Sequence, residues 1–138
     1  MKKMILVALF LSSNLMAYDI NLEISNMKNY KGQILIALFD KKDSFPQPDI
    51  IYKKGILKKI DDSVMKYTFK NIPKGVYAIT LVHDENANGK MNTNFLGMPK
   101  EGYGVSNNPK NRFLPPSFKQ GKFKLNKTTT FKIFMQYL

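Results

Sequence analysis

The fold of this chain is decided by one stretch near its middle, Val64-Met-Lys-Tyr-Thr-Phe-Lys-Asn-Ile-Pro-Lys-Gly-Val-Tyr-Ala-Ile-Thr-Leu-Val-His83. Apolar and polar residues alternate over its first seven positions, and a period of two residues is typical of a half-buried β-strand. Ile72-Pro73-Lys74-Gly75 has proline second and glycine fourth, which a type I turn favours. A second strand is expected from Val76 to His83. The stretch therefore predicts two consecutive strands joined by a tight turn.

Further short strands are predicted on both sides of this pair. The same alternation marks residues 18–25, and residues 33–39 are apolar on both faces, as expected of a central strand. A weaker strand signal lies at 55–59, and two last strands flank an Asn126-Lys127 turn. No segment has the period of a helix. About seven short strands with frequent turns predict an all-β fold, an antiparallel sandwich.

The N-terminus has the pattern of a secretory signal peptide. Lys2 and Lys3 precede an apolar run from Met4 to Leu11, and a small-residue exit ends at Ala17. We expect cleavage near Ala17, which makes residues 1–17 the signal peptide and 18–138 a single β-sandwich domain, periplasmic or secreted. The apolar run is shorter than the roughly 20 residues that span a bilayer. No second such run follows, so we expect no transmembrane segment in the mature chain.

Composition restricts the chemistry that the chain can perform. There is no cysteine, which excludes disulfides, thiolate metal sites and a cysteine nucleophile. The chain has 22 basic and 10 acidic residues, a formal net charge of +12. Such a surface can bind nucleic acid, anionic lipid headgroups or acidic glycans. Export argues against nucleic acid, so we expect a cell-envelope partner such as an anionic glycan or lipid headgroup; alternatively, the lysines only keep the strands soluble.

One long segment, residues 84–118, has neither helical nor strand periodicity and is expected to form a single structured loop that carries the specific function. Its opening, Asp84-x-Asn-x-Asn-Gly89, matches the first half of a calcium loop. The residues that would supply oxygens are Asp84, Asn86, Asn88, Lys90 and Asn92. Lys90 would contribute its backbone carbonyl, the others their side chains, and the affinity would be weak, about 10⁻⁴–10⁻³ M.

The alternative to this calcium cofactor is a loop without metal. The same side chains would then accept hydrogen bonds from nearby backbone amides as Asx-turns. Gly89 would adopt a positive φ in either case, because its place in the pattern requires a sharp turn. Both interpretations remain open from the sequence.

Four further residues are candidates for binding, namely His83, Glu101, Tyr103 and Ser106. His83 is the only histidine, and one imidazole without cysteine makes a poor transition-metal site. A strand-end histidine with a hydrogen-bond partner fits the pattern better. A catalytic triad of His83, Asp84 and Ser106 can be drawn, since triads are recognised by geometry. Adjacent strand residues point to opposite faces, however, which places Asp84 badly for orienting His83.

Aromatic residues are interleaved with basic residues in the same segment. The aromatic set is Phe95, Tyr103, Phe113 and Phe118, and the basic set is Lys100, Lys110 and Arg112. Together they could hold an anionic glycan or an extended strand of a partner. Alternatively, each ring pins the loop onto the sandwich and covers one open end of the core. An exposed cluster of rings would favour binding.

Two parts of the sequence resemble known families. Phe69-Lys-Asn-Ile-Pro-Lys-Gly-Val-Tyr-Ala-Ile79 resembles the strand–turn–strand signature of transthyretin-like and collagen-adhesin B-type sandwich domains. A longer pattern resembles an exported bacterial family, number 2141 among the domains of unknown function. That pattern comprises His83-Asp-Glu-Asn-x-Asn-Gly-Lys-Met-Asn-Thr-Asn94, Gly97-Met-Pro-Lys-Glu-Gly-Tyr-Gly-Val-Ser-Asn107 and Pro116-Ser-Phe118.

This resemblance covers nearly the whole mature chain. It implies an immunoglobulin-like or transthyretin-like sandwich in the periplasm, and it implies no known activity. One position departs from the family, which usually has an aspartate where this chain has Asn92.

The sequence thus favours a non-enzymatic periplasmic binding or structural module whose loop is ordered by calcium or by its own side chains. The second hypothesis is a metal-dependent or hydrolase-like enzyme that uses His83, Asp84 and Glu101. Geometry separates the two. Oxygens converging from residues 84–92 would favour an ion-ordered loop, whereas an open cleft joining His83, Glu101 and Ser106 would favour catalysis.

Overall fold

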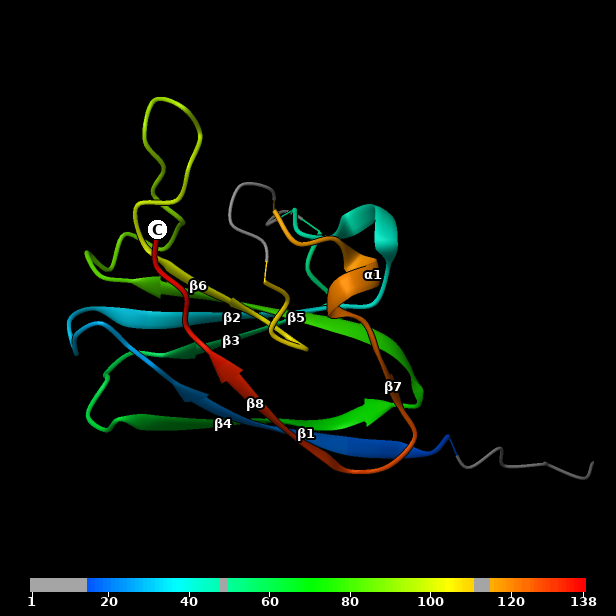
Figure 1. Cartoon of the computed structure of the whole chain (residues 1–138). Helices are drawn as coiled ribbons and strands as arrows, with labels where there is room; N and C mark the ends of the chain where they lie inside the picture. The colour runs from blue at the N-terminus through cyan, green and yellow to red at the C-terminus, as the bar shows by residue number, and fades with distance from the viewer. Residues whose placement is uncertain (1–14, 48–49, 111–114) are drawn as a thin grey trace, which may run out of the picture.

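Eight strands and two short helices are present in the computed structural model, which describes residues 15–47, 50–110 and 115–138 (Figure 1). In chain order they are β1 (Ala17–Ser25), β2 (Gln33–Phe39), η1 (Lys42–Ser44), β3 (Lys53–Leu57), β4 (Val64–Pro73), β5 (Gly75–Asp84), β6 (Gly102–Val105), α1 (Phe118–Gly121), β7 (Phe123–Leu125) and β8 (Thr129–Phe134). The all-β prediction is therefore confirmed. Most of the expected signal peptide, and Arg112 and Phe113, lie outside the described residues.

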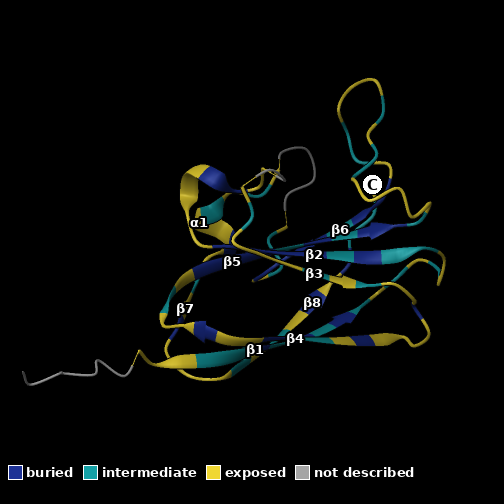
Figure 2. Ribbon diagram, turned by 180° about the vertical axis from the view of Figure 1, so that it is seen from behind, coloured by how far each residue is buried: buried dark blue, intermediate teal, exposed yellow. Residues whose placement is uncertain are grey.

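The strands form two sheets that pack face to face (Figures 1 and 2). The smaller sheet has the order β4-β1-β8, and the larger has the order β3-β2-β5-β6, with β7 paired to the start of β5. The core lies between them and consists mainly of Ile20, Leu22, Ile24, Ile34, Ile36, Leu38, Phe69, Ile79, Leu81, Leu125 and Ile133, all at most 2% exposed. In β1, β4, β7 and β8 these are the apolar positions of the alternating patterns, so the inward faces of these four strands were predicted correctly.

The tight turn of the 64–83 stretch does not close a hairpin. Only a bend at Lys74 separates β4 from β5, and the two strands belong to different sheets. The chain therefore crosses from one layer to the other at this bend, where the Tyr77 hydroxyl donates to the Pro73 carbonyl at 2.7 Å. The Asn126-Lys127 turn behaves in the same way, since β7 pairs with β5 and β8 pairs with β1. Local turn chemistry predicted where the chain reverses and not which strand it then pairs with.

The antiparallel prediction fails for one strand pair, because β8 runs parallel to β1 from Ile20↔Thr129 to Ser25↔Phe134. Beyond β8 the tail crosses to the larger sheet, where Gln136 forms an antiparallel bridge with Tyr103. The tail thus links both layers along one side of the sandwich. Strand β6 is a second difference, because it lies inside the segment predicted to be one continuous loop. Its residues, Gly102 to Val105, include two glycines and so lack an alternating pattern.

A second apolar cluster lies on the outer face of the larger sheet. Its members are Ala37, Phe39, Phe45, Ala78 and Val105, with Ile51 and Phe118 packed against them. Phe45 meets the Phe39 and Phe118 rings edge to face, with ring centroids 5.2 Å and 5.9 Å apart. Helix α1 and residues 41–46 thereby cover one half of this face (Figure 2). The other half leads to the candidate site.

Candidate functional site

The long segment begins at the end of β5, where the carboxylate of Asp84 is completely buried. Its Oδ1 accepts from the Asn88 backbone N–H at 3.1 Å. Its Oδ2 accepts from the Gly89 N–H at 2.8 Å and from Gln33 Nε2 at 2.7 Å. One side chain therefore ties the first turn of the loop to strand β2, and the two charge-assisted backbone contacts orient the Asn-rich turn.

A second buried carboxylate, that of Glu101, closes the loop from its other end. It is 6% exposed and accepts from the Glu85 N–H at 3.2 Å and the Asn92 N–H at 3.0 Å. The Asn92 amide lies beside it, and with its nitrogen facing the carboxylate it donates to Glu101 Oε2 at 3.2 Å. Glu101 thus joins two points of the segment that are seven residues apart in sequence, counted from 85 to 92.

The residues predicted to bind calcium are neighbours in the structure. Asn86 and Asn88 gather at the Asn92 side chain, and Lys90 donates its N–H to Asn88 Oδ1 at 3.1 Å. Gly89 has a φ of +81°, the positive value expected for the sharp turn. The hydrogen bonds are those of Asx-turns, as in the metal-free alternative. No three His, Asp or Glu side chains gather as a metal site within the described residues, so calcium binding stays a prediction that rests on two carboxylates and several amides.

His83 is completely buried, and both of its ring nitrogens have partners. Nε2 lies 2.8 Å from the Lys31 carbonyl and donates to it, and in the neutral imidazole Nδ1 then accepts from the Tyr137 hydroxyl at 2.6 Å. The same hydroxyl accepts from the Lys28 N–H at 2.9 Å. His83 therefore holds the C-terminal tail and the turn before β2 together. Burial raises the pKa of the Tyr137 hydroxyl above its ordinary value of 10.0.

The substitution Tyr137→Phe is expected to lower the free energy of unfolding by about 1–3 kcal/mol at neutral pH, because it leaves the buried Nδ1 of His83 without a donor. It should also flatten the alkaline limb of the stability curve. The pKa of Tyr137 is raised in the folded state, so the unfolded chain loses its proton first and stability falls as pH rises above 10. Urea unfolding between pH 7 and 11 measures both effects. A variant as stable as the wild type at every pH would show that neither the Tyr137 hydrogen bond nor its ionisation contributes to stability.

Ser106 is also buried and occupied by structural contacts. Its Oγ accepts from the Ile79 N–H at 3.0 Å and donates to the Gly121 carbonyl. Ile79 precedes His83 by four residues along β5, roughly 13 Å at 3.3 Å per residue. The structure therefore separates Ser106 from His83, and it points Asp84 toward Gly89 rather than toward the imidazole.

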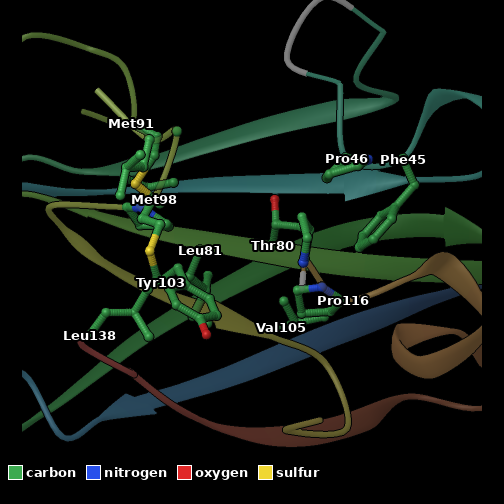
Figure 3. A pocket seen from close by; sticks show the side chains of 16 residues that line it. Phe45, Pro46, Thr80, Leu81, Met91, Met98, Tyr103, Val105, Pro116 and Leu138 are labelled. Carbon is green, nitrogen blue, oxygen red and sulfur yellow. The ribbon is translucent and has the colours of Figure 1, made fainter. Parts of the chain in front are cut away.

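Tyr103, the fourth candidate for binding, lines an apolar hollow on the outer face of the larger sheet (Figure 3). The hollow has a volume of about 480 Å³. Strand β5 forms its floor, Met91, Met98 and Leu138 lie with Tyr103 at one end, and prolines and Phe45 lie at the other (Figure 3). This volume and this apolar lining are typical of small-molecule sites, which measure roughly 300–1,000 Å³.

A second hollow of about 570 Å³ continues from the first across β2 and β3. The two share the lining residues Pro46, Thr80, Val82 and Met91. The second also carries two lysines at its margin, Lys54 and Lys90. Together they form one apolar surface, the outer hollow, with cationic groups on one side.

The outer hollow was not predicted from the sequence, although two signals for it were present. Strand β2 was recognised as apolar on both faces, and the second face of β5 carries Val82 and Ala78. These patterns indicated that something covers the outer face. Only the three-dimensional arrangement shows that the cover is incomplete near Val82.

The aromatic residues of the long segment have different roles. Phe118 packs on Phe45 and so holds the segment against the sandwich, although it covers the outer face of the larger sheet and not an open end of the core. Tyr103 lines the hollow, whereas Phe95 is 95% exposed. The rings therefore do not form one exposed cluster within the described residues.

Comparison with known proteins supports the longer of the two resemblances. The family model described as "Uncharacterized protein conserved in bacteria (DUF2141)" matches residues 22–132. No curated protein and no solved structure matched the chain. The assignment of the sandwich to the immunoglobulin-like or transthyretin-like type stays a prediction.

Proposed function

The chain belongs to the DUF2141 family of uncharacterised bacterial proteins, and from the geometry of its outer sheet face we propose that it is a non-enzymatic binding module for an anionic amphiphile. The ligand class is a small molecule with one apolar chain and one acidic head group. The observation that carries this proposal is the outer hollow, whose lining is mostly apolar and whose margin is cationic.

The apolar part of the ligand has a suitable environment on the floor of the hollow. Val82 and Thr80 project from β5, and Met91 and Met98 border them from the loop. Methionine side chains adapt to ligands of different shape because they are unbranched and polarisable. Burying apolar surface there contributes roughly 25 cal/mol for each Å² removed from water. This environment favours an aliphatic chain over a sugar or a nucleotide.

The charge pattern selects the head group. Lys54 and Lys90 lie at the margin of the second hollow, and the chain as a whole carries a formal charge of +12. A carboxylate or phosphate head could pair with either lysine while its chain occupies the hollow. A cationic amphiphile would be repelled at the same place.

The polar groups available for catalysis have other partners, which supports a binding role over an enzymatic one. Both ring nitrogens of His83 and the hydroxyl of Ser106 are bonded within the fold. The carboxylates of Asp84 and Glu101 accept from the backbone of the loop. General acid–base catalysis needs such groups within reach of a substrate, and these face inward.

The test is calorimetric titration of the protein with dodecanoate, and the decisive variant is Val82→Asp. Val82 lines both parts of the outer hollow, so a carboxylate there should repel the head group and hydrate the apolar floor. We expect the variant to bind at least tenfold more weakly, about 1.4 kcal/mol. Wild-type binding should show a negative heat-capacity change, the mark of apolar burial.

The matched control is Val76→Asp on the same strand, at a position that is 40% exposed and pairs with Lys124. It makes the same change of charge outside the hollow and should leave dodecanoate affinity unchanged. Equal loss in both variants would assign the effect to net charge. Absence of wild-type binding would refute the proposal.

Export to the periplasm stays a prediction from the first 17 residues. The described part of the chain contains no helix long and apolar enough to cross a membrane. Strand β1 starts at Ala17, so cleavage near that residue would leave the strand almost intact.

A further inference from the structure

A small hairpin, residues 92–100, stands out from both sheets within the long loop (Figure 1). Asn94 N–H donates to the Met98 carbonyl and Lys100 N–H to the Asn92 carbonyl, both at 2.8 Å. Thr93 and Pro99 face each other between these two bonds as an antiparallel bridge. The segment is therefore a short two-stranded ribbon with its own register.

The tip of the hairpin is fixed by one side chain. Asn94 Oδ1 accepts from the N–H groups of Leu96 at 2.9 Å and Met98 at 3.0 Å, and the Asn94 carbonyl accepts from Gly97 N–H at 2.9 Å. Gly97 adopts a φ of +76°, which closes the turn at little steric cost because glycine has no Cβ. Three hydrogen bonds thus hold the backbone of a five-residue tip.

This ordered tip presents two large apolar side chains to solvent. Phe95 is 95% exposed and Leu96 is 70% exposed. An isolated exposed apolar residue is common on protein surfaces. Two consecutive ones at the end of a hydrogen-bonded projection are a different arrangement, because the turn keeps them away from the core that would otherwise bury them.

The charges around the tip are positive. Lys90 precedes the hairpin, Lys100 ends it, and both are exposed. Residues 92–100 contain no acidic side chain, and the acidic residue that follows, Glu101, is buried and accepts from the Glu85 and Asn92 N–H groups. The 92–100 hairpin therefore has an apolar tip, and basic residues lie where it joins the rest of the loop.

We propose that the 92–100 hairpin is a membrane-contacting element that inserts Phe95 and Leu96 into the surface of an anionic bilayer. Membrane-surface elements combine an apolar face that enters the headgroup boundary with basic residues that contact anionic lipids. Lys90 and Lys100 would contact those head groups while the two apolar side chains pass between them. Without Lys2 and Lys3 of the expected signal peptide, 20 of the 22 basic residues and all 10 acidic residues remain, and this excess of positive charge would attract the whole molecule to such a surface.

This inference goes beyond ligand binding in the outer hollow. Leu96 also borders the hollow, but Phe95 is not among its lining residues. Variants at Phe95 therefore test membrane contact separately. The alternative to a membrane is a second copy of the chain, which would cover the tip of the hairpin in a dimer.

The experiment uses residues 17–138, which contain every strand and helix described, and vesicles of phosphatidylcholine with or without 30 mol% phosphatidylglycerol. The chain has no tryptophan, so Phe95→Trp introduces a single tryptophan at the tip, which can be excited at wavelengths that tyrosine does not absorb. We expect its emission to shift to the blue with the anionic vesicles only. Phe134→Trp, 49% exposed on β8, is the matched control and should not shift.

Affinity is measured by co-sedimentation with the same vesicles. We expect Phe95→Ser to bind at least tenfold more weakly than the wild type, while its thermal unfolding is unchanged because Phe95 is exposed. The proposal is overturned if Phe95→Ser sediments like the wild type, or if the Phe95→Trp emission does not shift. It is also overturned if sedimentation velocity without lipid shows a dimer that Phe95→Ser dissociates.

Discussion

Replacing Asp84 by alanine is expected to lower the free energy of unfolding by about 3–5 kcal/mol. The carboxylate is completely buried and accepts from Asn88 N–H, Gly89 N–H and Gln33 Nε2. Hydrogen bonds to a charged group contribute about 1.5–3 kcal/mol each. The two backbone donors can regain water once the loop loosens, so the total loss is less than the sum of three bonds.

Amide hydrogen exchange measures separately how far the loop after β5 loosens when the Asp84 carboxylate is removed. We expect the N–H groups of Asn88 and Gly89 to exchange faster in Asp84→Ala, while those of β1 keep protection in proportion to global stability. Asp84→Asn should be intermediate, because its carbonyl oxygen can still accept. The control Asp62→Ala removes an exposed carboxylate that bonds only to its neighbours and should change stability little. An Asp84→Ala variant as stable as that control would show that the hydrogen bonds of Asp84 do not stabilise the fold.

The same variant decides whether calcium orders the loop. Thermal unfolding in a calcium series would show about 1.4 kcal/mol of added stability at tenfold excess over the dissociation constant. A saturable shift in the wild type that is absent in Asp84→Ala would establish the ion. Without a shift up to 10 mM, the hydrogen bonds of Asp84 and Glu101 alone would account for the order of the loop.

Replacing Gly32 by alanine is expected to cost more than about 3 kcal/mol or to prevent folding. Gly32 has a φ of +69°, a region that costs an ordinary residue roughly 1–2 kcal/mol. In addition, a Cβ at this position would overlap the Asp84 carbonyl oxygen and lie 2.7 Å from Glu85 Cα. These are backbone atoms at the end of β5, so no rotamer change can relieve the overlap.

Gly89→Ala is the matched control for this substitution. Gly89 has a similar φ of +81°, but nothing lies within 4 Å of an added Cβ. We therefore expect a loss of roughly 1–2 kcal/mol from the backbone conformation alone. Urea unfolding of both variants measures the difference. Equal stability of the two would show that the close approach of Gly32 to β5 has no energetic consequence.

Much of the fold could be predicted from the sequence because several strands of this chain, such as β1, carry apolar residues on one face only. Ile20, Leu22 and Ile24 alternate with polar residues, and all three are buried. Side chains of a strand alternate between its faces, so this pattern alone assigns the inward face. Strand β6 could not be found in the same way, because Gly102 and Gly104 have no side chain to show an alternation.

The candidate site was predicted only in part. The sequence indicated that residues 84–92 form a tight turn of carboxylate and amide groups, and the structure contains that turn. Glu101 was a candidate, but its spacing could not show that it closes the turn, since a contact with Glu85 across sixteen residues leaves no local pattern. Asp84 was paired with His83 in the catalytic hypothesis, but the two buried side chains bond to different partners.

By itself, therefore, the sequence determined most of the strands, the inward faces of those that alternate, and the Asn-rich turn after Asp84, because these depend on the local order of apolar and polar residues. Only the tertiary structure decided that β4 and β5 lie in different sheets, that β8 runs parallel to β1, and that an apolar hollow remains beside Val82. Strand pairing and incomplete cover depend on contacts between segments far apart in the chain. The balance of such contacts is set by packing in three dimensions and has no counterpart in the local sequence pattern.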